Sequence, residues 1–198
     1  MRNSRIIPVA LILIIVAIAI AALVSLARTV FFSGGTSQTV SQTDVSTDAL
    51  LNTAINHSVT MTVRGAIVAN EEFRSYKITV TPTTRTLTTY SGYLNTPIDQ
   101  ISVSNNTPAY EQFVYALDRA NLVKGTELTG ANNDTRGICA DGKVYEFGVI
   151  KDGKSVKTLW TSSCKESKGS LDANVGNLAA MFIDQIPKGV ELINKIVL

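Results

Sequence analysis

An uncharged apolar run from Ile6 to Leu26 constrains this chain more than any other feature of its sequence. As an α-helix of about 21 residues it would be roughly 32 Å long, enough to cross the hydrocarbon core of a bilayer. Arg2 and Arg5 precede the run, and only Arg28 follows it closely. The positive-inside rule then predicts a single-pass cell-membrane protein with residues 1–28 as cytoplasmic tip and signal-anchor, and the rest outside.

Two alternatives remain open for the apolar run. Ser25 and Ala27 fit the small-residue positions before a cut at Arg28, as in a cleaved signal peptide. The apolar region is longer than is usual for such a peptide, which favours the anchor. The second alternative is a buried core helix, although no polar residues mark a second face.

The composition changes after the anchor. Residues 29–48 are mostly small and polar and carry almost no charge, which predicts a flexible Ser/Thr/Gln linker, with residues 49–198 as one α+β domain. Three of the 18 basic residues flank the anchor, which leaves 15 against 16 acidic residues in the rest of the chain. Because this balance gives no electrostatic footprint for phosphate backbones, we expect no nucleic-acid partner.

Strand-forming Thr, Val, Ile and Tyr residues recur throughout the domain. Helix signals stand at Thr47-Asp48, at Thr107-Pro108 and at Asp172, the last followed by an apolar stripe that stops at Pro187. Strands and helices do not alternate as βαβ units, so the fold class predicted is α+β, an antiparallel sheet of about six strands packed with two to three helices. The predicted strands are 59–68, 74–81, 85–93, 98–103, 143–150 and 155–162.

The dipeptide Asp152-Gly153 predicts a two-residue type I′ turn between the last two strands. Such a turn sets a register that would place all six paired side chains on the core face, with Lys157 and Glu146 on the other face. The predicted pairs are Val149 with Val156, Phe147 with Thr158, and Tyr145 with Trp160.

Cys139 and Cys164 are the only cysteines. In an external, oxidising compartment we expect them to form a disulfide, and a pair of free buried thiols is the alternative. His57 is the only histidine, and its position indicates a surface or helix-end residue. Two cysteines and one histidine fall short of a closed zinc site, and phosphate-loop, dinucleotide and nucleophile-elbow motifs are missing from the sequence. We therefore expect no catalytic residues, no cofactor and no metal.

The aromatic side chains are better candidates for binding than for chemistry. Core packing accounts for most of them. Tyr90 and Tyr93, near the end of a predicted strand, are the two expected to be exposed, and they are the candidate contact residues.

The N-terminal Arg-x-x-Arg with its Ile/Ala/Val/Leu anchor and polar linker resembles small single-pass envelope proteins of Saccharibacteria and related bacteria. Thr62-Val63-Arg64-Gly65 and Leu159-Trp160-Thr161-Ser162-Ser163-Cys164 are similar to uncharacterised proteins of that group. The resemblance implies lineage and an envelope location, and no activity. Over residues 59–187 the predicted order of elements also resembles, in topology only, emfourin-type metalloprotease inhibitors.

These patterns together predict a non-enzymatic, membrane-anchored interaction domain whose partner is another surface or envelope protein. The first alternative is an inhibitor of an extracytoplasmic protease, in which an exposed loop such as Thr126–Gly137 or Glu71-Glu72 would engage the target. An atypical hydrolase is the second alternative, and a polar cleft would distinguish it from a binding domain.

Overall fold

The described part of the chain, residues 42–198 of a computed structural model, contains six β-strands and four α-helices. The anchor predicted at 6–26 and the linker residues 29–41 lie outside the described residues. Within residues 42–198, no helix combines the length and apolar character that crossing a bilayer requires. The elements in chain order are α2 (Gln42–Leu51), β1 (His57–Arg64), β2 (Arg74–Val80), β3 (Thr84–Ser91), β4 (Thr96–Ser104), α3 (Thr107–Arg119), the 3₁₀ turn η1 (Gly130–Asn133), β5 (Val144–Lys151), β6 (Lys154–Ser162), α4 (Val175–Ile183) and α5 (Gly189–Lys195).

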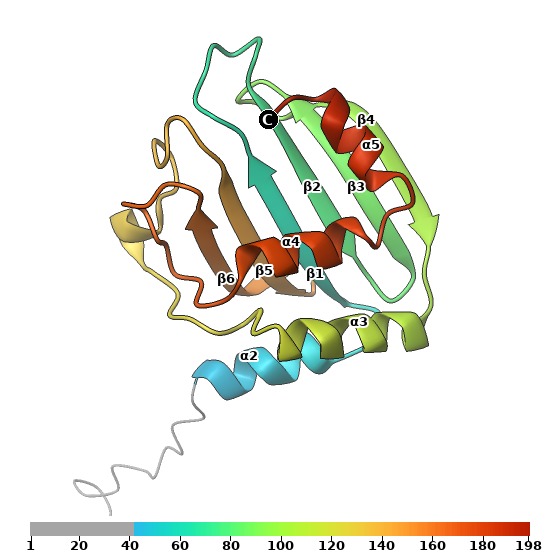
Figure 1. Ribbon diagram of the computed structural model, residues 1–198. Helices are drawn as coiled ribbons and strands as arrows, with labels where there is room; N and C mark the ends of the chain where they lie inside the picture. The colour runs from blue at the N-terminus through green and yellow to red at the C-terminus, as the bar shows by residue number, and fades with distance from the viewer. Residues whose placement is uncertain (1–41) are drawn as a thin grey trace, which may run out of the picture. The chain divides into compact units, whose positions relative to one another are not determined.

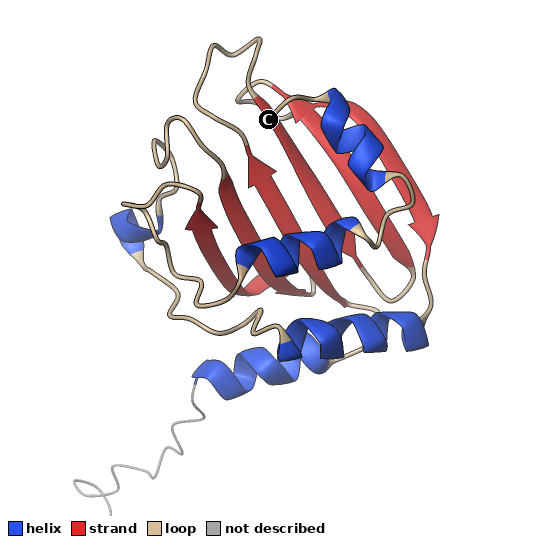
Figure 2. Ribbon diagram, in the orientation of Figure 1, coloured by secondary structure: helices blue, strands red, loops and turns tan. Residues whose placement is uncertain are grey.

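The strands form one antiparallel sheet in the order β4-β3-β2-β1-β5-β6. Helices α4 and α5 lie over one face of this sheet, and α3 and α2 cross its lower end (Figure 1). Helix and strand segments are segregated and not interleaved as βαβ units (Figure 2). The predicted α+β class with a six-stranded antiparallel sheet is confirmed.

The strands have two different faces, because successive side chains point to opposite sides. In β1, Val59, Met61 and Val63 are almost fully buried, whereas Thr60 and Thr62 between them are half-buried. We call the face that carries Val59, Met61 and Val63 the front face and the opposite one the back face. The front face is apolar and the back face is rich in hydroxyl groups.

The core lies between the front face and the helices. Phe182 of α4 packs edge-on against Phe113 of α3, with ring centroids 5.3 Å apart, and lies 5.9 Å from the ring of Phe147 on β5. Leu50 of α2 is fully buried in the same cluster. Burial of one such aliphatic or aromatic side chain contributes about 1.5–3 kcal/mol, and these contributions hold the helices against the front face and the lower end of the sheet.

Helix α2 begins earlier than the sequence indicates. The predicted linker extends to residue 48, but residues 42–48 are helical, so the linker prediction is wrong for them. Ser46 and Leu50 are buried against the domain, and tertiary packing therefore outweighs the low helix propensity of this Ser/Thr-rich segment. Ile55 lies beyond the end of this helix and is 74% exposed.

The described chain has four α-helices where two to three were predicted. The additional one is α5, which lies after Pro187, where the last helix signal of the sequence stops. Lys188, just after Pro187, is the N-cap residue of α5 and has a left-handed backbone (φ 60°). Leu192 of α5 is buried in the core. Helix α3 is capped by Asn106, whose Oδ1 accepts from the Ala109 amide at 2.9 Å.

The β5–β6 hairpin has the predicted turn but not the predicted register. Asp152 and Gly153 have φ values of 52° and 72°, as a type I′ turn requires. A bulge interrupts the pairing between Val149 and Ile150, and beyond it Val149 opposes Lys157. The predictions that Val149 opposes a valine and that Lys157 lies on the back face are therefore wrong.

The bulge shifts the rest of β6 by one residue, which moves each side chain beyond it to the other face. Leu159, not Thr158, opposes Phe147 and joins the front face. Trp160 lies on the back face and not opposite Tyr145, and it packs there in a small separate cluster with the disulfide. The turn dipeptide specifies the loop but carries no information about a bulge beyond it.

Strand β4 forms one edge of the sheet. The Asp99 carbonyl faces β3 and accepts from the Thr89 hydroxyl at 3.3 Å, so the amide of the next residue, Gln100, points outward. That outward amide donates to Oδ1 of Asp99 at 2.8 Å. A carboxylate thus occupies a backbone position that a further strand would need.

Candidate functional site

Three loops meet at the upper end of the sheet, opposite the end covered by α2 and α3 (Figure 1). They are the β1–β2 loop (residues 65–73), the β3–β4 turn (92–95) and the segment before β5 (135–143). Ile67, Val68 and Leu94 in these loops are large apolar residues that are 39–92% exposed. These exposed apolar side chains make this end of the sheet the candidate contact region.

A groove of about 430 Å³ lies between the three loops, and we call it the tip groove. Its walls are contributed by Arg64, Ile67, Phe73, Tyr93, Arg136 and Ile138. Arg64 alternates with the front-facing Val63, so the tip groove lies at the end of the back face. Its volume is in the lower part of the range typical of small-ligand pockets.

Two arginines give the tip groove its charge. Arg64 is half-buried, and its Nη2 donates to the hydroxyl of Thr135 across the groove. Arg136 forms a two-point ion pair with Asp134, with Nε 2.9 Å from Oδ1 and Nη2 2.6 Å from Oδ2. These charge-assisted bonds lower the pKa of Asp134 to about 2, so its carboxylate remains ionised at neutral pH.

The aromatic pair Phe73 and Tyr93 closes one side of the tip groove. Their rings are stacked with centroids 4.3 Å apart, and the Tyr93 hydroxyl donates to the Val68 carbonyl at 2.6 Å. Tyr93 is 46% exposed, as expected for a contact residue. Tyr90, the other candidate, is half-buried and not exposed as expected. It lies on the back face, in the cross-strand row that also contains Ser75 and Arg64.

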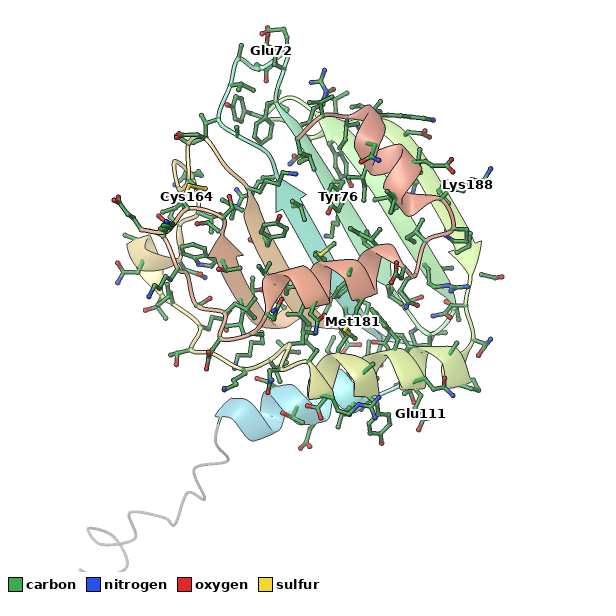
Figure 3. The ribbon with its side chains drawn as sticks, in the orientation of Figure 1. Glu72, Tyr76, Glu111, Cys164, Met181 and Lys188 are labelled. Carbon is green, nitrogen blue, oxygen red and sulfur yellow. A yellow bond between two sulfur atoms is a disulfide. The ribbon has the colours of Figure 1, made fainter. Side chains whose placement is uncertain are left out.

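The segment that carries Arg136 and Ile138 is fixed in place by the cysteines. Cys139 and Cys164 are joined in a disulfide with their Cα atoms 5.4 Å apart, as the sequence predicts (Figure 3). The Ile67 amide donates to the Ala140 carbonyl at 2.8 Å, which ties the β1–β2 loop to the same segment. The walls of the tip groove are therefore attached to one another and not only to the sheet.

The two loops considered for protease binding lie beside the tip groove. Glu71 and Glu72 are exposed at the far point of the β1–β2 loop, where Figure 3 shows Glu72 at the upper limit of the view. Within Thr126–Gly137, Asn133 accepts a hydrogen bond from Trp160 Nε1 at 3.1 Å, and η1 forms a short turn. The structure thus orders a segment that the sequence indicates only as a loop.

Two other buried ionisable groups, His57 and Lys157, lie away from the tip groove. His57 begins β1 at the opposite end of the sheet and is 3% exposed, so its placement at a surface or helix end is wrong. Burial lowers the pKa of His57, nearby Lys151 lowers it further, and Asp152 opposes both. Burial also lowers the pKa of Lys157, with Glu127 opposing. Across residues 42–198, no three His, Cys, Asp or Glu side chains are grouped as a metal site would require.

A second hollow, of about 410 Å³, lies on the other side of the β1–β2 loop, against residues 195–198. Its arginine, Arg74, donates to the carbonyls of Glu71 and Phe73 at 2.6 and 2.9 Å. Because those bonds engage its cation within its own loop, this hollow is a weaker candidate than the tip groove.

No family model matches the chain, and no curated protein sequence is similar to it. The interpretation of function therefore depends on the tip groove itself. The sequence indicates Tyr93 as a contact residue but gives no such indication for Arg64, Ile67 or Arg136. The adjacent apolar residues Ile67 and Val68 are the one available signal, and the strand predicted at 59–68 includes them, whereas β1 ends at Arg64.

Proposed function

We propose that this chain is a single-pass, membrane-anchored binding protein without catalytic activity, and that its domain contacts another surface or envelope protein through the tip groove. The observation that carries the proposal is the tip groove itself, where exposed apolar and aromatic side chains surround two arginines. Apolar anchors beside a guanidinium are the common composition of protein-binding hot spots.

The anchored topology is supported by sequence. Residues 6–26 are uncharged, Arg2 and Arg5 precede them, and the disulfide-forming cysteines suit an oxidising compartment outside the cytoplasm. The likeness of the N-terminal segment to Saccharibacteria-type envelope proteins supports the same location. The chain enters the described domain at α2, at the end of the sheet opposite the tip groove, so attachment there leaves the groove accessible (Figure 1).

The proposal is tested by surface crosslinking on intact cells that carry the full-length chain with a C-terminal tag, followed by mass spectrometry. We expect an impermeant antibody to reach the tag and one dominant protein partner to be crosslinked. Tyr93→Ser should abolish this capture, whereas Tyr115→Ser should not. Tyr115 is the matched control because it is 47% exposed, against 46% for Tyr93, and lies on α3 at the other end of the sheet.

The outcomes separate the parts of the proposal. A tag inaccessible on intact cells would contradict the outward topology. Equal capture by both variants would show that the tip groove is not the contact site, provided that both retain the thermal midpoint of the original chain. A single protease as partner, inhibited stoichiometrically by the purified chain, would support the inhibitor alternative instead.

A further inference from the structure

Arg64 is a half-buried cation that forms no ion pair within residues 42–198. The ion pairs of this part of the chain join Lys124 with Asp172 and Arg136 with Asp134, and neither includes Arg64. The hydroxyl of Thr135 accepts one of the five hydrogen bonds that a guanidinium can donate. The charge of Arg64 helps to lower the pKa of the nearby Asp134 carboxyl, but the two side chains form no ion pair within residues 42–198. Arg64 therefore keeps N–H donors that an anionic ligand can bind.

Arg136 provides a second donor that can be released. Its side chain is 87% exposed, so its ion pair with Asp134 is in contact with water and contributes little to stability. A ligand carboxylate can replace Asp134 at small cost and then be held by the planar fork of the guanidinium. The two arginines together are suited to one carboxylate and not to an extended polyanion.

The remaining walls are mostly apolar, with Asn95 and Thr135 as polar members. Ile67 is 44% exposed, Ile138 and Val144 also line the groove, and Phe73 is stacked on Tyr93 at the far side. A volume of about 430 Å³ accommodates one or two residues and not a folded surface. The tip groove therefore combines a carboxylate position with an adjacent apolar position.

We infer that the tip groove binds the C-terminal residue of a polypeptide whose last side chain is apolar. The terminal carboxylate lies against Arg64 and Arg136, and the side chain lies among the apolar walls. A chain end fits better than a free acid because Arg64 begins a cross-strand row on the back face that passes through the buried Ser75 to the half-buried Tyr90. The residues before the chain end can extend from the groove along that face. This inference rests on the proposed function and names the kind of segment that the partner supplies.

The test is fluorescence anisotropy with the full-length chain in detergent micelles. The probes are fluorescein-labelled Gly-Ser-Gly-Ser-X peptides in which X is Ala, Val, Leu, Ile or Phe, each made as the free C-terminal acid and as the amide. We expect the acids with large apolar X to bind at least about tenfold more tightly than their amides, because the amide loses the charge-assisted bonds to guanidinium. We also expect Leu or Ile to bind more tightly than Ala.

Variants connect the effect to the tip groove. Arg64→Gln should weaken binding of the acids by about tenfold and reduce the difference between acid and amide to the part that Arg136 provides. Arg119→Gln makes the same change in charge on exposed α3 at the other end of the sheet and should change nothing. Asp134→Asn should strengthen binding, because it frees Arg136. If Arg64→Gln lowers the thermal midpoint, the exposed Arg136→Gln replaces it and should weaken binding several-fold.

Three results would overturn the inference. Equal binding of acids and amides would show that the carboxylate is not recognised, while the groove-dependent surface capture tested by Tyr93→Ser would still support the proposed function. Binding of N-acetyl-leucine as tight as that of the Leu peptide would identify a free acid as the ligand. If no acid binds at millimolar concentration, chain-end recognition is excluded. If the surface crosslinking also captures no partner, the proposed function is contradicted as well.

Discussion

On the front face of the sheet, helices bury the apolar side chains of β1, β2 and β5. On the back face the same strands carry hydroxyl and charged groups, and no helix of residues 42–198 lies over them. The back face has a cluster of three buried residues around the disulfide, at one corner only. Neighbouring residues on one strand thus belong to two different environments. The packed core, which dominates stability, is on the front face, and the surface available for contact is at the back and at its upper end.

The largest expected difference between the faces is within β2. Ile78 is fully buried on the front face and its neighbour Lys77 is exposed on the back face. Ile78→Ala should reduce the free energy of unfolding by about 2–5 kcal/mol, because it removes buried methyl groups and leaves a cavity. Lys77→Ala should change it by less than about 0.5 kcal/mol. Urea denaturation of both variants gives the two free energies of unfolding. Similar decreases in the two variants would contradict the assignment of the faces.

The corner cluster of the back face is expected to depend on its covalent bond. Cys139→Ser should lower the free energy of unfolding by about 3 kcal/mol under oxidising conditions, because the unfolded chain regains the freedom that the crosslink removes. Under reducing conditions the variant and the original chain should have the same midpoint. Thermal denaturation with and without dithiothreitol makes the comparison, and equal midpoints in both solutions would exclude the disulfide.

A substitution in the turn that joins β5 to β6 is expected to reduce stability by a smaller amount. Gly153 has φ 72°, and a Cβ added there would have no atom within 4 Å, so a substitution adds backbone strain without a steric clash. Gly153→Val should therefore cost about 1–2 kcal/mol. Denaturant unfolding gives the value. Unchanged stability would mean that the turn does not have positive φ and that both faces of the hairpin need reassignment.

The buried end of β1 gives the smallest expected effect, which is a dependence on pH. The pKa of His57 is lowered by burial and by Lys151, so below its ordinary value of 6.5 the unfolded chain binds more protons than the folded one. The free energy of unfolding should therefore fall as pH decreases through 6.5. His57→Gln should show a shallower fall over the range from about pH 7.5 to about pH 5. Parallel curves for the two chains would show that His57 is accessible to protons in the fold.

Much of the fold could be predicted because local signals and tertiary packing agree. The Asp152-Gly153 turn, the strand runs and the helix at Thr107 all follow from backbone preferences that the packing does not oppose. The register of β6 could not be predicted, because the bulge next to Val149 depends on how the side chains pack in the core and not on the local sequence. The early start of helix α2 could not be predicted for a similar reason, because its stability comes from contacts with the domain.

The site is less predictable than the fold. Tyr93 is recognisable as a strand-end aromatic, and the cysteine pair is recognisable by its number alone. Arg64 and Arg136 come from distant parts of the sequence and meet only because β1 and β5 are neighbours in the sheet. Long-range pairing of this kind leaves no periodic trace in one sequence, so the charge of the tip groove becomes visible only in three dimensions.

The carboxylate on the β4 edge has a consequence for how copies of this protein behave together. An edge strand offers unpaired amides to any neighbouring strand, and proteins held on a membrane meet one another at high local density. A second copy that paired with β4 would first have to remove Asp99 from the Gln100 amide and then leave that negative charge without its hydrogen bond. Pairing between copies along β4 is therefore disfavoured, including between copies that are held on a membrane as we propose.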